Sequence, residues 1–139
     1  MLFRSSYGRS PKQRTLIKYS LEEINKLKNN KNELKIDFTN VNIEHIMPQE
    51  PKEWGLTKKQ VSEYVNKIGN LTLLSISLNS TASNKVISKK IIDLEQSELL
   101  ITKELVSELK NSNFLWDQEA IEKRQRNFAE LSHSQIWNI

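Results

Sequence analysis

Apolar side chains recur at helical spacing in the first part of the chain, between residues 12 and 28. The recurring residues are Leu16, Ile17, Leu21, Ile24 and Leu27. A return every three or four positions places such side chains on one face of a helix. Ser20 followed by Glu23 has the form of a capping box, which would start the helix at Ser20 instead. The pattern therefore predicts a helix over 12–28 and leaves its first residue open.

A period of two follows, and this alternation is typical of extended chain. Its apolar members are Leu34, Ile36 and Phe38 and, after a turn at Thr39-Asn40, Val41, Ile43 and the less apolar His45. Pro48 and Pro51 end the extended stretch, because proline cannot donate a backbone hydrogen bond to a neighbouring strand. We expect a pair of strands in this region.

Helical signals return after residue 56. Thr57 is of the residue type that caps a helix, here a short one over 58–67, and Gly69 stands where a left-handed residue would end it. A further short strand is predicted by the apolar residues Leu71, Leu73 and Leu74.

Three more helices are predicted in the last part of the chain. Their candidate N-caps are Ser83, Thr102 and Asp117, and the first of these helices would extend to about residue 94. The candidate core positions of the last helix are Ile121, Phe128, Leu131 and Ile136, between Trp116 and Trp137.

Together these elements predict an α+β fold that is mostly α-helical, with a short hairpin and a helix at its centre. At 139 residues the chain has the length of one domain. We expect a single domain over 1–139, made of an N-terminal helical flank (1–32), a central unit (33–94) and C-terminal helices (95–139).

The distribution of charge bears on the partner of this domain. The net charge is +4, and residues 1–31 carry eight Lys or Arg against two Glu. Residues 52–90 carry seven Lys against two Glu, whereas residues 91–139 carry nine acidic and five basic side chains. Two basic blocks suit a polyanion such as nucleic acid. On charge alone, a solvated lysine-rich surface explains them equally well.

Several classes of protein are excluded by what the chain does not contain. The sequence has no cysteine, which excludes disulfides, thiolate nucleophiles and cysteine-bound zinc and fits a reducing cytoplasm. It has no apolar run of membrane-spanning length and no apolar signal core at its start. It also has no Gly-x-x-x-x-Gly-Lys phosphate loop. We expect a soluble, cytoplasmic protein without a membrane partner.

The candidate chemistry lies in two short segments. They read Ile43-Glu44-His45-Ile46-Met47-Pro48-Gln49 and Ile68-Gly69-Asn70-Leu71-Thr72-Leu73-Leu74, and Asn79 follows the second. Phosphodiester hydrolysis needs an activated water, and a histidine is suited to activate it near neutral pH. A divalent cation such as Mg²⁺ takes few protein ligands, all through oxygen. Glu44 and Asn79 can supply a carboxylate and an amide oxygen.

The order of the acid and the base sets a geometric condition. Neighbours in an extended strand point to opposite faces, so Glu44 and His45 can serve one site only if the bend before Pro48 re-aims one of them.

At these segments the chain resembles the HNH endonucleases, also called ββα-metal or His-Me finger nucleases. Their motif is acid-His-Ile-x-Pro, then Asn-Leu, then Asn or His nine residues later, and a nearby Lys. Asn70 and Asn79 have this spacing. More narrowly, the chain resembles the C-terminal nuclease domain of GmrSD-type Type IV restriction proteins. That likeness continues through Trp116, Ile121, Arg124, Ile136 and Trp137.

The resemblance implies a ββα-metal core within 33–94 and an endonuclease that restricts foreign DNA, modified DNA included. It implies that His45 is the general base, that Glu44 and Asn79 hold the cation, and that Asn70 braces the hairpin loop and orients the base. The cation would be Mg²⁺ in the first instance, with Mn²⁺ as an alternative, and no organic cofactor is implied. Asn84 is a rival ligand of metal or phosphate. The implied DNA-phosphate contacts are Lys89, Lys90 and Arg124.

Family members with a restriction role usually join this domain to an N-terminal nucleotide-dependent sensor. The resemblance therefore implies a sensor domain or subunit outside this chain. Two features depart from the wider HNH pattern. Glu44 stands where most of these enzymes have Asp, although the GmrSD-like branch carries Glu there. The cysteine-bound zinc that braces many HNH domains is impossible here, so the flanking helices must replace it.

Each assignment has a structural alternative. A lone His near apolar residues is more often structural, Glu44 could be a surface carboxylate, and Asn79 could be a turn residue. Helical lysines are usually only solvated, and His133 stands in no acid-His motif. For the whole chain, the alternatives are a catalytically silent nucleic-acid-binding module or subunit of a larger defence complex, and a helical protein-interaction domain with a chance motif.

Overall fold

The computed structural model describes residues 7–8, 10–28, 37–82 and 84–136. Its helices are α1 (Pro11–Lys28), α2 (Lys58–Val61), α3 (Ile76–Ala82), α4 (Ile87–Leu94), α5 (Leu100–Asn111) and α6 (Gln118–Ile136). Its strands are β1 (Val41–His45) and β2 (Leu71–Ser75), and the short 3₁₀ turns are η2 (Phe38–Asn40), η3 (Pro51–Trp54) and η4 (Ile68–Asn70). The α+β fold expected from the sequence is confirmed.

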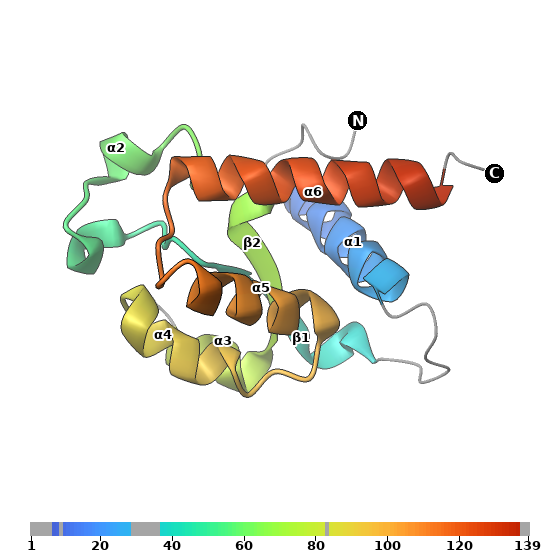
Figure 1. Cartoon of the computed structure of the whole chain (residues 1–139), viewed down its shortest axis with the longest axis horizontal. Helices are drawn as coiled ribbons and strands as arrows, with labels where there is room; N and C mark the ends of the chain where they lie inside the picture. Colours follow the sequence, from blue (N-terminus) through green and yellow to red (C-terminus); the bar gives the residue numbers. More distant parts are fainter. Residues whose placement is uncertain (1–6, 9, 29–36, 83, 137–139) are drawn as a thin grey trace.

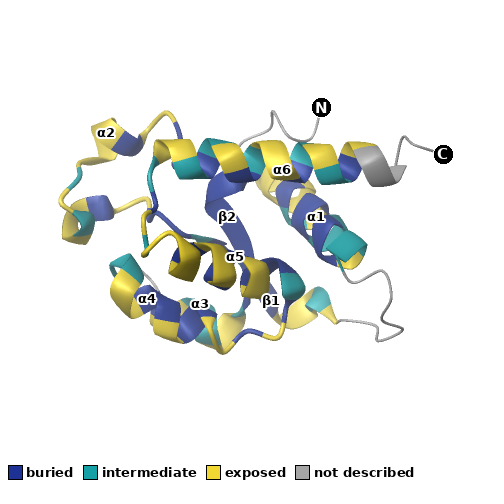
Figure 2. Cartoon of the chain, viewed as in Figure 1, coloured by how far each residue is buried: buried dark blue, intermediate teal, exposed yellow. Residues whose placement is uncertain are grey.

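The two strands form an antiparallel pair at the centre of the molecule. Val41 lies opposite Ser75, and His45 lies opposite Leu71. Figure 1 shows α1 and α6 on one side of the strands, α3 and α4 on the opposite side, and α5 across β2. Because helices cover both of its faces, β2 is buried along nearly its whole length (Figure 2).

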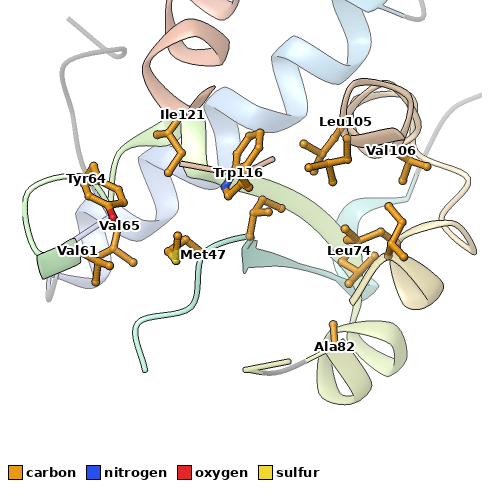
Figure 3. Close-up of a cluster of buried hydrophobic side chains, with 14 residues drawn as sticks. Met47, Val61, Tyr64, Val65, Leu74, Ala82, Leu105, Val106, Trp116 and Ile121 are labelled. Carbon is orange, nitrogen blue, oxygen red and sulfur yellow. The ribbon is translucent and has the colours of Figure 1, made fainter. Parts of the chain in front are cut away.

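The core consists of two apolar clusters. One joins the segment after β1 to α4, α5 and the start of α6, and Figure 3 shows Met47, Trp116 and Ile121 within it. The other joins α1 to β2 and α6, and includes Ile17, Leu21, Ile24, Leu71, Leu73 and Phe128. The apolar face predicted over 12–28 is therefore real, although Leu16 remains exposed.

The helix α1 begins before the Ser20 capping box that the sequence offered as a later start. The Ser20 hydroxyl donates to the carbonyl of Leu16 at 2.9 Å, within the helix. A serine in a helix interior often makes this bond to the preceding turn.

The predicted pairing of two strands before Pro48 was wrong. Phe38 lies in the turn η2, because the Asp37 carboxylate accepts hydrogen bonds from the Thr39 amide at 2.9 Å and hydroxyl at 2.7 Å. The partner of β1 is β2, which comes after the long connection 46–70. Leu34 and Ile36 lie outside the described residues.

The short helix α2 is capped as predicted but ends early. Thr57 and Gln60 form a reciprocal capping box, and the Ser62 hydroxyl then donates to the carbonyl of Lys59 at 2.8 Å. Such side-chain bonds compete with helical backbone bonds, and the chain continues in turns up to Asn66.

Gly69 is not the left-handed cap that the sequence suggested. It lies in η4, where a Cβ atom would stand 2.1 Å from the carbonyl oxygen of Ile121 in α6. Glycine is therefore required here for close packing. The left-handed glycine among the described residues is Gly55, with φ of 74°, which ends η3.

The later helices differ from the prediction in number and in their first residues. The helix α3 was not expected, since its Ser/Asn-rich sequence resembled a loop, and Ser83 lies outside the described residues. The helix α5 begins at Leu100, and Thr102 is buried with its hydroxyl on the carbonyl of Leu73 at 2.6 Å. Asp117 caps α6 as predicted, accepting from Ala120 at 2.9 Å.

Of the core positions expected in α6, Ile121 and Phe128 are buried and Leu131 is partly buried. Trp116 is buried before the helix begins. The side chains of Ile136 and Trp137 lie outside the described residues. No helix in the described part of the chain is both long and apolar enough to cross a membrane.

Candidate active site

The end of β1, the segment after it and α3 enclose an open cleft of about 380 Å³. Its lining includes Glu44, His45, Asn79 and Asn84. The first two come from β1, and Asn79 comes from the middle of α3. The strand pair and the helix that follows it therefore bring the predicted acid, base and amide to one surface, although Glu44 and His45 are neighbours in a strand.

Glu44 is buried, with 5% of its surface exposed, and both of its carboxylate oxygens are engaged. Lys90 Nζ lies 2.9 Å from Oε1. Asn79 Nδ2 donates to Oε2 at 2.5 Å and to the carbonyl of Ile43 at 3.3 Å. Burial raises the pKa of the Glu44 carboxyl, and the nearby Lys90 ammonium opposes that rise. The charged form of Glu44 therefore depends on Lys90.

Lys90 is fully buried although it is a lysine. Its ammonium donates to Glu44, to the carbonyl of His45 at 2.8 Å and to the carbonyl of Ile46 at 3.1 Å. Burial lowers the pKa of Lys90, and the Glu44 carboxylate opposes that shift. Three acceptors match the three N–H donors of an ammonium group, so Lys90 joins α4 to the end of β1.

His45 is half-buried at the last position of β1. Its Nε2 lies 3.0 Å from Asn66 Oδ1, and the Tyr7 ring packs edge-on at 4.8 Å between ring centroids. Burial lowers the pKa of His45 to about 4. The imidazole is therefore neutral at neutral pH, which is the form that can accept a proton.

Asn70 is fully buried and uses its whole amide group. Oδ1 accepts from the Met47 amide at 2.8 Å and from Trp116 Nε1 at 2.9 Å. Nδ2 donates to the carbonyls of Met47 at 2.9 Å and Val65 at 2.7 Å. Asn70 therefore fixes the segment that follows His45, and it reaches the histidine through the backbone.

Two of the predicted phosphate contacts need correction. Lys90 faces the interior, because all of its donors are used within the protein. Arg124 is 3% exposed and lies over the Phe128 ring, with Nη1 on the carbonyls of Gly69 at 2.9 Å and Leu71 at 2.5 Å. Burial lowers its pKa to about 10. Arg124 thus attaches α6 to the start of β2, whereas Lys89 is exposed on α4.

Three residues around His45 had no predicted role. Asn66 lies in a segment that was expected to be helical, and Gln49 Nε2 donates to the same Asn66 oxygen at 3.1 Å. The Tyr7 amide donates to the Asn66 carbonyl at 2.7 Å. Gln49 ends the first motif segment, whereas Tyr7 and Asn66 lie outside both segments. The contacts of these residues with His45 or with each other join positions far apart in the chain.

The donors at the cleft suit a hard cation with few protein ligands. Among the described residues, no three His, Cys, Asp or Glu side chains are grouped so that they could hold a metal ion. Glu44 and Asn79 would supply one carboxylate and one amide oxygen, with water completing the shell, as Mg²⁺ accepts. Asn79 presents its nitrogen to Glu44, so its amide must turn over to act as a ligand. After that rotation the two side chains would present oxygen donors of the kind that Mg²⁺ takes.

The comparison with protein families identifies a restriction-system domain. The model of the C-terminal domain of GmrSD restriction endonucleases matches residues 3–131, which is most of the chain. The comparisons with curated proteins and with solved structures found no match. The family match confirms the narrower of the two resemblances, the one to the C-terminal domain of GmrSD-type proteins. The chain therefore belongs to the C-terminal domain family of the GmrSD restriction endonucleases.

Proposed function

We propose that this domain is a metal-dependent DNA endonuclease of the HNH type, acting in the restriction of foreign DNA, modified DNA included. The observation that carries this proposal is the meeting of Glu44, His45 and Asn79 at one cleft, built by an antiparallel strand pair and the helix after it. This arrangement offers an acid, a neutral base and an amide to one substrate. The family match supports a nuclease of a restriction system.

His45 acts as the general base. Its imidazole is neutral, since burial lowers its pKa to about 4, and it lines the open cleft that a phosphate backbone can approach. The proton of the attacking water passes to the imidazole while the water oxygen bonds to phosphorus and the bond to the leaving 3′ oxygen breaks. Asn70 keeps the backbone after His45 in place through both polar groups of Met47.

Glu44 and Asn79 hold the divalent cation, with Mg²⁺ preferred and Mn²⁺ as an alternative. When bound, the cation supplies charge stabilisation to the scissile phosphate and to the leaving oxygen. Lys90 keeps Glu44 ionised by donating to Oε1. Asn84 lines the same cleft and is a further candidate ligand of metal or phosphate.

DNA is the proposed partner, and Lys89 is the predicted phosphate contact that remains exposed. A nucleotide-dependent sensor domain or subunit is a proposed second partner, which would control when the cleft meets DNA. The basic blocks and the resemblance to GmrSD-type proteins support DNA as the partner, whereas the sensor is implied by the resemblance alone.

A catalytically silent binding module is the second candidate, and one observation favours it. The Lys90 ammonium already neutralises the buried Glu44 carboxylate at 2.9 Å. Such an ion pair can serve structure alone. The two candidates differ in whether divalent metal is required for turnover.

The test is plasmid cleavage by the purified domain. Supercoiled plasmid is incubated with Mg²⁺ or Mn²⁺, with EDTA, and with His45→Ala. His133→Ala, which removes the chain's other histidine, is the matched control. Nicking by wild type and His133→Ala, but not by His45→Ala or with EDTA, is the expected result. If wild type is inert with every metal, also on DNA with modified cytosine, while salt-dependent DNA binding persists, the binding module replaces the nuclease.

A further inference from the structure

Asn66 contacts the candidate base from outside the motif. His45 Nε2 lies 3.0 Å from Asn66 Oδ1, and both groups are partly buried. Gln49 Nε2 reaches the same oxygen at 3.1 Å. Two side-chain nitrogens thus lie against one carbonyl oxygen, which has two lone pairs to accept N–H groups.

The backbone of Asn66 is held in place as well. Its carbonyl accepts from the Tyr7 amide at 2.7 Å, and the Tyr7 ring stands edge-on to the His45 ring with an interplanar angle of 88°. Arg14 lies over the Tyr7 ring at 5.3 Å and donates to the carbonyl of Gly8 at 2.8 Å. His45, at the end of β1, is therefore flanked by Asn66 and by Tyr7, which precedes α1.

A hydrogen bond to one ring nitrogen determines what the other can do. An amide oxygen can only accept, so a neutral His45 that bonds to it must carry its proton on Nε2. Nδ1 is then left with its lone pair. In the described part of the chain no hydrogen bond to Nδ1 competes for that pair. A base with one fixed tautomer and one fixed ring orientation is preorganised for proton transfer.

We infer that Asn66 is a positioning residue of the active site, which holds His45 as the Nε2–H tautomer and leaves Nδ1 as the atom that accepts the proton from water. This inference rests on the proposed role of His45 as general base. Asn66 acts neither on the reacting atoms nor on the proposed metal ligands directly. Its effect passes through the His45 ring, in the manner of outer partners that orient catalytic imidazoles.

The first readout is nitrogen NMR of the imidazole, which is independent of activity. The chain has two histidines, so a His133→Gln background leaves His45 as the single imidazole to assign. Above neutral pH we expect a protonated Nε2 with a slowly exchanging proton and an unprotonated Nδ1. Asn66→Asp should keep this pattern, because a carboxylate also only accepts. Asn66→Ala should abolish the slow exchange and shift the nitrogen resonances towards a mixture of tautomers.

The second readout is steady-state cleavage. Asn66→Ala should lower kcat by about 10- to 100-fold, the usual cost of losing such a partner, with little change in KM. Asn66→Asp should restore most of kcat, and Asn127→Ala, an exposed asparagine on α6, should leave it unchanged.

A protonated Nδ1 in the wild-type domain, or an unchanged Nε2 proton signal in Asn66→Ala, would overturn the inference. A folded Asn66→Ala domain with unchanged kcat would overturn it too. If the wild type shows the expected tautomer but cuts no DNA, the proposed function fails while the role of Asn66 in fixing the imidazole stands.

Discussion

Lys90 and Glu44 form a buried ion pair that holds the end of β1, at the cleft where we propose that Glu44 binds a metal ion. Lys90 is fully buried, and its three bonds reach Glu44 and two backbone carbonyls at the end of β1. Moving an ammonium and a carboxylate out of water is costly, and each makes the burial of the other tolerable. The pair therefore fixes the end of β1, and each of the two charges can stay buried only while the other is present.

Replacing Lys90 by Met should destabilise the domain by about 3 kcal/mol, because it leaves the Glu44 carboxylate buried without a partner. Lys89→Met on the same helix is the matched control, since Lys89 is exposed, and should change the free energy of unfolding by less than about 0.5 kcal/mol. Urea denaturation measures both. The double variant Glu44→Gln/Lys90→Met should recover part of the loss. Equal midpoints for the two single variants would show that the ion pair contributes no stability.

At the scale of the elements, η4 illustrates how closely the chain packs around the site. Gly69 has the carbonyl of Ile121 against the position where a Cβ would be, and its amide donates to Gln125 Oε1 at 3.2 Å. Asn70 follows directly and holds Met47. The approach of η4 to α6 therefore sets the position of Asn70, and through it that of the segment after His45.

Gly69→Ala should lower the free energy of unfolding by about 2 kcal/mol, as overpacking against a backbone atom typically does. Gly55→Ala is the comparison, since its Cβ would meet open space but its φ is 74°. Strain alone should cost it about 1 kcal/mol. Thermal or urea unfolding of both variants gives the order. A Gly69→Ala domain as stable as wild type would mean that η4 and α6 can separate without cost.

The elements also show what the sequence could predict. Periodicity located α1 and α6, because each buries one face of a helix. It also located β1, although this strand buries Val41 and Glu44, which lie on opposite faces. It failed at α3, whose Ser and Asn residues favour loops by local propensity although contacts with the strands hold the segment as a helix. It also failed to predict the partner of β1. Strand partners can be distant in sequence, and the Asp37 side chain stabilises the turn η2 where a preceding strand was expected.

For the site, the resemblance of the motif to HNH nucleases implied that Glu44, His45 and Asn79 act together, and all three line the same cleft. Residue type did not predict burial, and so Lys90 and Arg124 were assigned to the surface. Asn66 could not be found from the sequence at all. Its contact with His45 depends on how the turns after α2 fold back onto β1, which no local pattern encodes.

At the scale of the whole molecule, Arg124 connects the last helix to the central strands. Its guanidinium donates to the carbonyls of Gly69 and Leu71 and lies 4.5 Å from the Phe128 ring centroid. One further nitrogen, Nη2, is buried without a hydrogen-bond partner among the described residues. Arg124 thus serves the assembly of the domain.

Arg124→Gln should cost about 2 kcal/mol of unfolding free energy, the usual contribution of hydrogen bonds from a charged donor. The salt dependence of DNA binding should keep its slope, because no phosphate contact is lost. A variant that removes such a contact lowers that slope by about one. Lys123→Gln, exposed on the same helix, is the control for stability. A reduced slope with unchanged stability in Arg124→Gln would restore the phosphate contact that the sequence suggested.

The unequal burial of Glu44 and His45 has a consequence for how the sequence of this family evolves. In proteins no longer selected for DNA cleavage, replacing Glu44 or Lys90 alone leaves an unpaired charge in the interior. Such a replacement destabilises the fold, so selection for folding opposes it. His45 is half-buried and neutral, so its replacement carries no comparable penalty. Members of this family that have lost nuclease activity should therefore retain the residues equivalent to Glu44 and Lys90 after the histidine has been replaced.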